Sequence, residues 1–520
     1  MLRRVRVPEE QSHIRFTNPA LLLLLLIMLG GTALRIAFLP HEALEGDELF
    51  SRRVALLSPV SEIAAIRNDL VHPPLYYFLL QATTKLWGDS ATGIRTFSLL
   101  CGIASIGLLG LMGRMLPNGL KAGLLAATIL AVNQTHIFYS QEARSYAWYA
   151  LLVLLLVFWV WRVTRPSGNP PSLRHWVLGT LLMTMLVYTH YVGAIYIGSA
   201  VLAILLSHTP RAVRIATLLC AAIAALCFVP WLIAIAGVYK LKRGISDNLD
   251  WQGHPTLYSL KQIFASALGI LNMRGGTTLV LAILALLILA ALLLGRQPPL
   301  RQSPVVLTLL LLAVLPPLAV FFLSRPPFNL PLFGIRHFLP SAPLLILLCC
   351  YGLVRIAQQA GSHSTLVFSM GTVLLLAFAS IPTLRGLILR PSRIPYDLVS
   401  QEVTRERAAG VPAYATWFYG VGEPVNFYCA IACVAPLPQD TQQLPSKMVL
   451  LFRANSSQEL WQYQQLQQNG YAEIEERYYS DGEQDPYGTT LAVLTRFAPY
   501  RGNAADSASA SKSTGTPVSR

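Results

Sequence analysis

The chain has 520 residues, of which 54% are hydrophobic and only 12% are charged. Soluble domains carry about 25% charged residues, so this composition excludes an ordinary soluble protein and indicates a polytopic membrane protein. The net charge of +15 comes from short basic clusters between apolar runs, a pattern typical of a cytoplasmic membrane face. We therefore expect these charges to face a lipid bilayer and not nucleic acid.

A transmembrane helix needs about 20 largely apolar residues. After a cytoplasmic N-terminus at 1–17, the sequence predicts about eleven such helices. They are expected at 18–39, 94–113, 121–138, 146–162, 175–190, 192–207, 213–236, 276–294, 304–323, 338–355 and 365–384. Hydropathy is continuous from the fifth to the sixth, and one helix of that length would be longer than the bilayer is thick. We therefore place a break near Thr189-His190-Tyr191.

The distribution of basic residues predicts the orientation. With the N-terminus inside, the inner segments contain only Glu9 and Glu10 as acids. Their basic residues are Arg3, Arg4, Arg6, Arg15, Arg114, Lys121, Arg162, Arg165, Arg174, Arg211, Arg214, Arg296, Arg301 and Arg355. This bias follows the positive-inside rule. The outer face then receives a first loop at 40–93, a second loop at 139–145 and everything after 385.

The first outer loop carries an adjacent acid pair, Asp47 and Glu48, just beyond the first apolar run. Its pattern predicts short helices on the membrane surface at 48–57, 59–66 and 75–87. Solvated acids are common at membrane edges, so the pair alone does not indicate a reaction site; the residues that follow it do.

A rigid turn, His72-Pro73-Pro74, lies further along the same loop and starts the third surface helix at its first turn. Two tyrosines, Tyr76 and Tyr77, come directly after it. An aromatic belt at the membrane surface accounts for the tyrosines equally well, whereas His72 is harder to explain in that way.

Further polar groups gather on the same expected side of the membrane. Partly buried polar groups at a membrane edge must be hydrogen-bonded or paired, although any one of these could merely anchor a helix end. They are Glu142, Arg144 and Tyr146 around the second outer loop, together with Arg95, His190, Tyr191, Arg336 and His337. Acids, histidines and arginines are thus expected on the side of Asp47.

A carboxylate pair facing arginines at a membrane surface suits one kind of chemistry. The carboxylate can take a proton from an attacking hydroxyl or hold a divalent ion, while arginines stabilise an anionic leaving group. A lipid phosphate is such a leaving group, since its tail can lie between helices while its headgroup reaches an aqueous loop.

The order of four motifs resembles one family over roughly residues 15–385. The motifs are Gly-Asp-Glu at 46–48, His-Pro-Pro-Leu-Tyr-Tyr at 72–77, Tyr-Ser-Gln-Glu-Ala-Arg-Ser-Tyr at 139–146 and Arg-His-Phe-Leu-Pro at 336–340. They resemble the GT-C glycosyltransferases of the protein O-mannosyltransferase and aminoarabinose transferase superfamily, similar to glycosyltransferase family 39. The resemblance implies a polyprenyl-phosphate-linked sugar as donor, transfer outside the cytoplasm and inversion at the anomeric carbon.

The resemblance also assigns residues. Asp47 matches the first-loop acid, a general base or an acceptor-orienting carboxylate, and Glu48 matches its supporting or metal-binding neighbour. His72 stands where the aminoarabinose transferases carry a lysine, a departure that leaves its contact with donor phosphate open. Arg144 and Arg336 are expected to contact that phosphate because a guanidinium is permanently charged and binds in a bidentate manner.

Metal dependence stays open at this point. Asp47 and Glu48 together offer oxygen ligands of the kind that divalent cations prefer. No spacing of further ligands supports a dedicated site, so we expect at most a loosely held divalent cation and no other cofactor.

The segment at 386–500 differs in kind from the apolar region. Strands are expected at 413–418, 447–452 and 489–496, and helices at 396–409, 421–428 and 456–469, which together predict a small extracytoplasmic α/β domain. A disulfide between Cys429 and Cys433 is compatible with an exported domain, although a separation of four residues often does not allow it. The Ala- and Ser-rich end, 501–520, is expected to be a disordered tail.

Two other function classes are weighed against the transferase. A lipid flippase or transporter should place ionisable residues near the bilayer midplane, whereas the apolar runs here are nearly free of charge in their middles. A ligase or polymerase of lipid-linked glycans is nearer and would differ only in its acceptor. The sequence therefore predicts a glycosyltransferase of the bacterial inner (plasma) membrane with an unknown extracytoplasmic acceptor.

Overall fold

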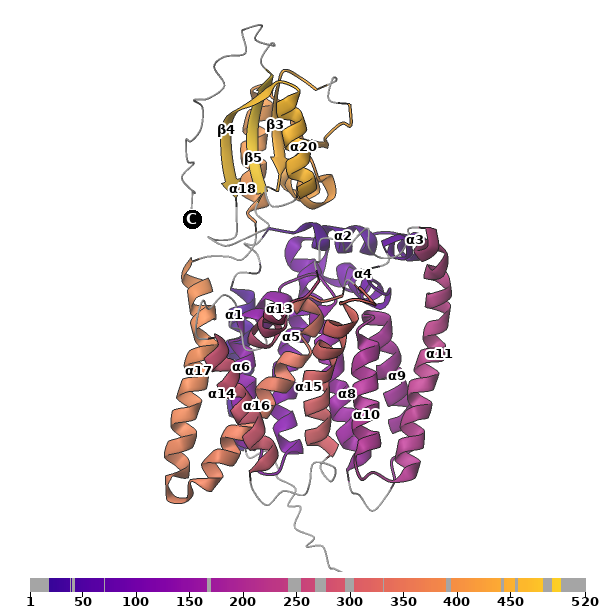
Figure 1. Ribbon diagram of the computed structural model, residues 1–520, viewed down its shortest axis with the longest axis vertical. Helices are drawn as coiled ribbons and strands as arrows, with labels where there is room; N and C mark the ends of the chain where they lie inside the picture. Colours follow the sequence, from indigo (N-terminus) through magenta and orange to yellow (C-terminus); the bar gives the residue numbers. More distant parts are fainter. Residues whose placement is uncertain are drawn as a thin grey trace, which may run out of the picture.

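The computed structural model describes residues 18–37, 39, 43–69, 71–165, 170–241, 254–266, 277–294, 304–330, 332–389, 394–440, 444–453, 457–479 and 489–496. Figure 1 shows two parts, a large helical bundle and a smaller unit of strands and helices beyond one end of it. The expected N-terminal segment at 1–17 and the expected tail at 501–520 lie outside the described residues.

The bundle contains a helix for each of the eleven apolar runs. These are α1 (Asn18–Ile36), α5 (Ala91–Met112), α6 (Leu120–Ala131), α8 (Tyr146–Thr164), α9 (Leu173–Thr189), α10 (Gly193–Leu206), α11 (Arg211–Leu241), α14 (Thr277–Leu293), α15 (Pro304–Leu323), α16 (Ser341–Gln359) and α17 (Ser364–Leu389). Within the described ranges, α1, α5, α8, α11, α15, α16 and α17 are long and apolar enough to cross a membrane. The break between α9 and α10 falls at 190–192, where the sequence predicts it.

The expected span at 121–138 is wrong as a single helix. It divides into α6, which ends at Ala131, and α7 (Gln134–Ser140). Between them Asn133 has an extended backbone and its side chain accepts a hydrogen bond from the backbone N–H of His136 (2.9 Å). An asparagine that caps a new helix in this way competes with continuation of the old one.

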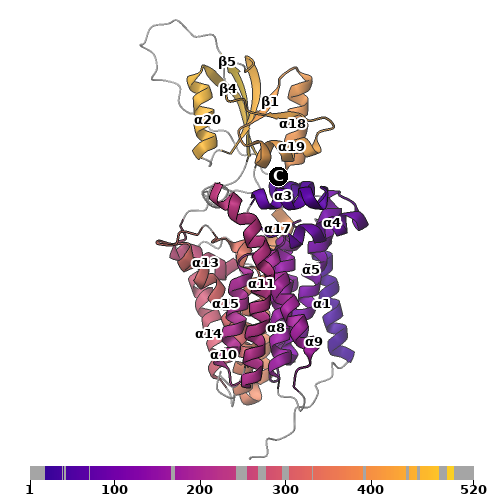
Figure 2. The same ribbon diagram turned by 90° about the vertical axis from the view of Figure 1, so that its right-hand side faces the viewer.

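Three short helices cover one end of the bundle, close to the ranges that the sequence predicts. They are α2 (Gly46–Ala55), α3 (Pro59–Asp69) and α4 (Leu75–Trp87). Figures 1 and 2 show α2 and α3 lying across the bundle on the side of the smaller unit. The same end holds α13 (Leu257–Ser266) and the 3₁₀ turn η3 (Ile335–Phe338), while η1 (Gly113–Met115) and η4 (Gly361–His363) connect helices elsewhere.

The smaller unit is a five-stranded mixed sheet flanked by helices, with the strand order β2-β1-β3-β5-β4. In chain order its elements are α18 (Tyr396–Ala408), β1 (Ala413–Ala415), the π-turn η5 (Phe418–Gly422), α19 (Glu423–Tyr428), β2 (Val434–Pro436), β3 (Lys447–Phe452), α20 (Ser457–Gln468), β4 (Tyr471–Tyr479) and β5 (Thr489–Arg496). β1 pairs in parallel with β2 and β3, and β5 pairs antiparallel with β3 and β4.

Alternation along β3 gives this unit two small cores. Val449 and Leu451 pack on the side of α18 and α19, whereas Leu450 and Phe452 pack on the side of α20. Successive side chains of a strand point to opposite faces, so an unbroken apolar run is what a strand covered on both sides requires. A disulfide joins Cys429 and Cys433, which settles the pairing that the sequence leaves open.

Candidate functional site

Asp47 lies at the start of α2 and faces two arginines from distant parts of the chain. Its Oδ2 is 3.2 Å from Nη1 of Arg336, in η3, and 3.8 Å from Nη2 of Arg144, in the second outer loop. The Asp47 side chain is 50% exposed, whereas that of Arg144 is 5% exposed. Arg144, followed by Arg336, lowers the pKa of Asp47 below its usual value. The three residues thus form a solvent-accessible carboxylate held ionised between two permanent cations.

Glu48 points the other way and is fully buried. Nε and Nη2 of Arg95, in α5, donate to its two oxygens at 2.8 and 2.6 Å, and the backbone N–H of Ala143 donates to Oε1 at 2.8 Å. Arg95 also donates to the carbonyl oxygens of Leu39 (3.3 Å) and Ala43 (2.9 Å). Adjacent helix positions face different directions, so the acid pair divides between one solvent-facing group and one structural group.

Arg144 is a hub among the outer loops. It donates to the backbone oxygen of Asp47 (3.2 Å), Oγ of Ser51 (3.2 Å), Oη of Tyr77 (3.5 Å) and Nδ1 of His72 (3.2 Å). An arginine that donates to four acceptors has little freedom left, so its remaining surface is pre-organised for an anion.

The hydroxyl of Ser98 contacts both Tyr76 and the backbone of Arg144. Ser98, in α5, donates to the backbone oxygen of Arg144 (3.1 Å), and its Oγ is also 3.3 Å from the phenol oxygen of Tyr76. Tyr76 is therefore a buried support behind the arginine, and not a group that reaches the exposed face of Asp47.

Three histidines form a buried cluster behind Arg144, with ring centroids of His72 and His190 5.5 Å apart and those of His190 and His337 5.0 Å apart. Two tyrosines complete this histidine cluster: Tyr146 lies 5.9 Å from His72, and Tyr149 stacks on His190 at 4.8 Å. Tyr149 comes from the interior of α8, where the sequence offers no sign of its role.

The hydrogen bonds of the cluster indicate neutral imidazoles. Because Arg144 donates to Nδ1 of His72, the proton belongs on Nε2, which is 3.5 Å from Oη of Tyr146. Burial, followed by the charge of Arg144, lowers the pKa of His72 well below its usual value. Burial, followed by Arg336, lowers the pKa of His337 to about 4. Neutral histidines add no positive charge to that of the two guanidiniums, which the carboxylates of Asp47 and Glu142 face.

The remaining candidates lie at different distances from this centre. Glu142 is buried next to Arg144 in the second outer loop, and its charge raises the pKa of nearby Tyr139, although burial is the larger cause. Tyr191 packs toward α11, where Nε1 of Trp231 donates to its hydroxyl at 3.2 Å. The structure thus brings His190 into the cluster and turns its neighbour Tyr191 away.

Arg35 is a supporting residue that the sequence analysis misses. It lies fully buried in the last turn of α1 and donates to the carbonyl oxygens of Leu130 (3.1 Å) and Ala131 (3.0 Å), at the end of α6. It also lies 2.8 Å from Nδ1 of His136 in α7, which leads into the second outer loop. A charged residue inside a predicted span is the signal that could have found it.

Close backbone packing allows this arrangement. A Cβ on Gly102 of α5 would lie 2.2 Å from Oγ of Ser140, so only glycine permits α7 to approach α5 there. Ser140 in turn accepts from Nε of Arg35 (3.3 Å). The second outer loop, with Arg144, is therefore anchored to α1, α5 and α6.

The expectation of a metal held by Asp47 and Glu48 does not fit the geometry. Both oxygens of Glu48 already accept from Arg95, and Asp47 lies between two cations that repel a metal ion. In the ranges that the structure describes, no group of three or more His, Cys, Asp or Glu side chains is placed to hold a metal.

Comparison with known proteins finds a family model that matches part of the chain and solved structures of similar fold. Residues 71–233 match the family described as dolichyl-phosphate-mannose-protein mannosyltransferase. The match includes His72, Arg95, Arg144 and His190, but Asp47 lies outside it. The search among curated proteins found no match.

Two solved structures have a similar fold. One is ArnT from Cupriavidus metallidurans in the apo state, with a TM-score of 0.53, 13% sequence identity and coverage of 91% of this chain and 98% of that chain. The other is ArnT from the same organism bound to undecaprenyl phosphate, with a TM-score of 0.51, 14% identity and coverage of 91% and 97%. At this identity the likeness concerns the fold.

Proposed function

We propose that this chain belongs to the GT-C superfamily of membrane glycosyltransferases and transfers a sugar from a polyprenyl phosphate to an acceptor hydroxyl outside the cytoplasm; the partial family match and the similar fold support this proposal. The observation that carries this proposal is the convergence of Asp47, Arg144 and Arg336 at one end of the apolar bundle. A similar fold in a protein bound to undecaprenyl phosphate supports the donor class.

The two arginines are the proposed phosphate ligands. A donor in which phosphate links a sugar to a polyprenyl chain carries one negative charge, and departure of the phosphate leaves two. Arg144 and Arg336 would stabilise this growing charge where it develops, which is the most effective form of electrostatic catalysis. His72 would hold Arg144 in place through Nδ1.

Asp47 is the proposed base. The acceptor hydroxyl oxygen attacks the anomeric carbon, the bond from that carbon to the phosphate oxygen breaks, and the hydroxyl proton passes to Asp47. Attack opposite the leaving group inverts the anomeric centre. In the structure the arginines keep the pKa of Asp47 low; once phosphate shares their charge, the carboxylate becomes a better base at the moment when it is needed.

Glu48 has a positioning role in this proposal. Its buried bonds to Arg95 and to the N–H of Ala143 join α2 to α5 and to the loop of Arg144. Replacing Glu48 would therefore misplace both Asp47 and Arg144 without removing a reacting group.

The positive-inside bias of the sequence supports a site on the extracytoplasmic side, and the proposal places the protein in the inner membrane of a bacterial cell. In this orientation α2, α3 and the sheet lie on the outer side, together with Asp47. The donor tail would lie along the bundle and its headgroup would reach α2.

The test is sugar transfer by purified protein in lipid nanodiscs. Polyprenyl-phosphate sugars are supplied with membrane extract as acceptor, and mass spectrometry follows the release of free polyprenyl phosphate. Asp47→Asn should abolish release. Asp89→Asn is the matched control, because Asp89 is also a half-exposed acid (47%) paired with an arginine, Arg52. Equal turnover by wild type and Asp47→Asn would refute the assignment.

A further inference from the structure

The α/β unit contacts the helix that carries Asp47. The side chain of Glu423, at the start of α19, accepts from Nη1 of Arg53 in α2 at 2.7 and 3.0 Å. Two residues of the same α19 make further contacts: the ring of Phe427 lies 5.3 Å below the guanidinium of Arg52, and the hydroxyl of Tyr428 accepts from the backbone N–H of Leu44 at 2.7 Å. α19 therefore contacts both α2 and the segment just before it.

That segment is held from the opposite side as well. The carbonyl oxygen of Ala43 accepts from Nη2 of Arg95 (2.9 Å), while the side chain of Ala43 belongs to the apolar core of the α/β unit. Residues 43–48 thus lie between Arg95 of the bundle and Tyr428 of α19. The backbone that leads into Asp47 is therefore held from both sides.

A chain of contacts also runs from α19 to Arg144. Arg53 lies over the ring of Phe50 (5.7 Å), the rings of Phe50 and Tyr77 are 6.0 Å apart, and Tyr77 accepts from Arg144 (3.5 Å). Displacing Arg53 therefore acts on both proposed partners, the base and one phosphate ligand.

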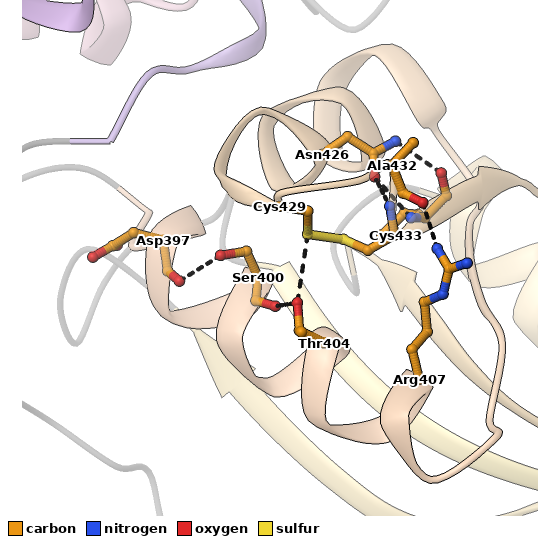
Figure 3. The surroundings of a disulfide bond; sticks show 9 residues. Asp397, Ser400, Thr404, Arg407, Asn426, Cys429, Ala432 and Cys433 are labelled. Carbon is orange, nitrogen blue, oxygen red and sulfur yellow. Dashed lines mark hydrogen bonds between the residues drawn. A yellow bond between two sulfur atoms is a disulfide. The ribbon is translucent and has the colours of Figure 1, made fainter.

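The disulfide stabilises α19, which with its contacts to Leu44, Arg52 and Arg53 is called the clamp below. Figure 3 shows that the bond between Cys429 and Cys433 closes the loop directly after Tyr428, and that Asn426 of α19 bonds the same loop. Oδ1 of Asn426 accepts from the N–H groups of Cys433 and Val434, both at 2.7 Å. A six-residue helix would not hold its shape alone, and this loop fixes its last turn.

We propose that α19 is a positioning element of the transferase, in which Glu423 and Tyr428 hold α2 so that Asp47 faces Arg144 and Arg336. This inference rests on the proposed function, because it assigns these residues a role through Asp47. It gives the α/β unit a part in catalysis that requires no contact with donor or acceptor.

The test is a charge-reversal pair. Arg53→Glu and Glu423→Arg each place like charges together and should lower kcat about tenfold or more, since a shift of about 1 Å in a catalytic group can cost 10²-fold. The double variant restores the attraction with reversed signs and should recover most of kcat. Affinity for polyprenyl phosphate should fall less than kcat does, because Arg336 comes from η3 and Arg144 is also held by His72.

Two further variants test the same clamp by other means. Tyr428→Phe leaves the N–H of Leu44 without its acceptor, and Cys429→Ser with Cys433→Ser frees the loop after α19; both should lower kcat and leave affinity for polyprenyl phosphate unchanged. Arg405→Glu is the control, since it removes an exposed ion pair within the α/β unit itself and should leave kcat unchanged.

The outcomes separate the two proposals. If Asp47→Asn is inactive while Arg53→Glu and Tyr428→Phe keep wild-type kcat, the clamp is refuted and the proposed function stands. If the double charge reversal is no better than the single variants at equal thermal stability, the direct pairing of Arg53 with Glu423 is refuted. If Asp47→Asn itself turns over normally, the proposed function fails first.

Discussion

The replacement Asp47→Asn should have two opposite effects, loss of transfer and tighter binding of polyprenyl phosphate. Asparagine keeps the shape of the side chain but removes the negative charge that lies 3.2 Å from Arg336 and 3.8 Å from Arg144. A phosphate that binds the same arginines from the other side would lie roughly 6 Å from that charge. With two negative charges on free polyprenyl phosphate, the repulsion at an effective dielectric constant of about 40–80 is about 1.4–2.8 kcal/mol. Removing it should raise affinity about 10- to 100-fold.

The assay is titration of the nanodisc-embedded protein with a short-chain polyprenyl phosphate, followed by intrinsic fluorescence or calorimetry. Raising the salt concentration should shrink the difference between the two proteins, because Asp47 is half exposed and its field is screened. An unchanged or weaker affinity in Asp47→Asn would show that the phosphate does not share these arginines. Tighter binding together with full transfer activity would show that Asp47 is not the base.

Three further outcomes are expected. Glu48→Ala should lower the free energy of unfolding by about 3–5 kcal/mol because it leaves Arg95 charged and fully buried. The double variant Glu48→Ala with Arg95→Met should be less destabilised than Glu48→Ala alone. A loss below about 1 kcal/mol, the range of exposed ion pairs, would contradict the buried pair. Burial raises the pKa of Glu62 to about 7, so the folded protein keeps a proton that the unfolded chain releases near pH 4.3. Thermal stability should therefore fall as pH rises from about 4 to about 7, and Glu62→Gln should remove this fall. An identical pH profile in the variant would exclude Glu62 as its source. Sugar transfer should persist in excess chelator, since Arg95 occupies both oxygens of Glu48, and loss of activity that added divalent cation restores would show that a metal takes part.

Much of the fold was predictable because its causes are local. Apolar runs of sufficient length predict the bundle helices, and the Pro73-Pro74 turn predicts where α4 begins. The sequence does not predict β4 because it is a strand with repeated glutamates, Glu473, Glu475 and Glu476, which pairs with β5 at the end of the described sheet. The identity of such a strand depends on its partner more than on its own residues.

The site was predictable in its membership but not in the direction of each side chain. Charge and aromatic content mark Asp47, Arg144 and Arg336 as candidates, and these three do meet. The family resemblance makes Asp47 the reacting acid and Glu48 its supporting or metal-binding neighbour, but only the direction of each side chain shows that the first is exposed and the second buried. That direction follows from the register of α2 against Arg95, which is a tertiary contact.

The contact between α2 and α19 was beyond sequence reasoning for the same reason. Arg53 and Glu423 are 370 positions apart, and each alone resembles an ordinary surface charge. Local sequence patterns do not predict such a pairing, since it depends on how two parts far apart in the chain pack against each other.

The central claim is that Arg144 and Arg336 bind the phosphate of the donor beside Asp47. The most direct measurement is the affinity of Arg336→Ala for polyprenyl phosphate, with Arg144→Lys tested in parallel because lysine keeps the charge but not the forked geometry. Loss of one charged hydrogen-bonding group costs about 1.5–3 kcal/mol, which predicts roughly 10- to 150-fold weaker binding by Arg336→Ala. The control Arg52→Ala, which loses the pair with Asp89 instead, should bind polyprenyl phosphate as wild type does. Wild-type affinity in both Arg336→Ala and Arg144→Lys would contradict the claim.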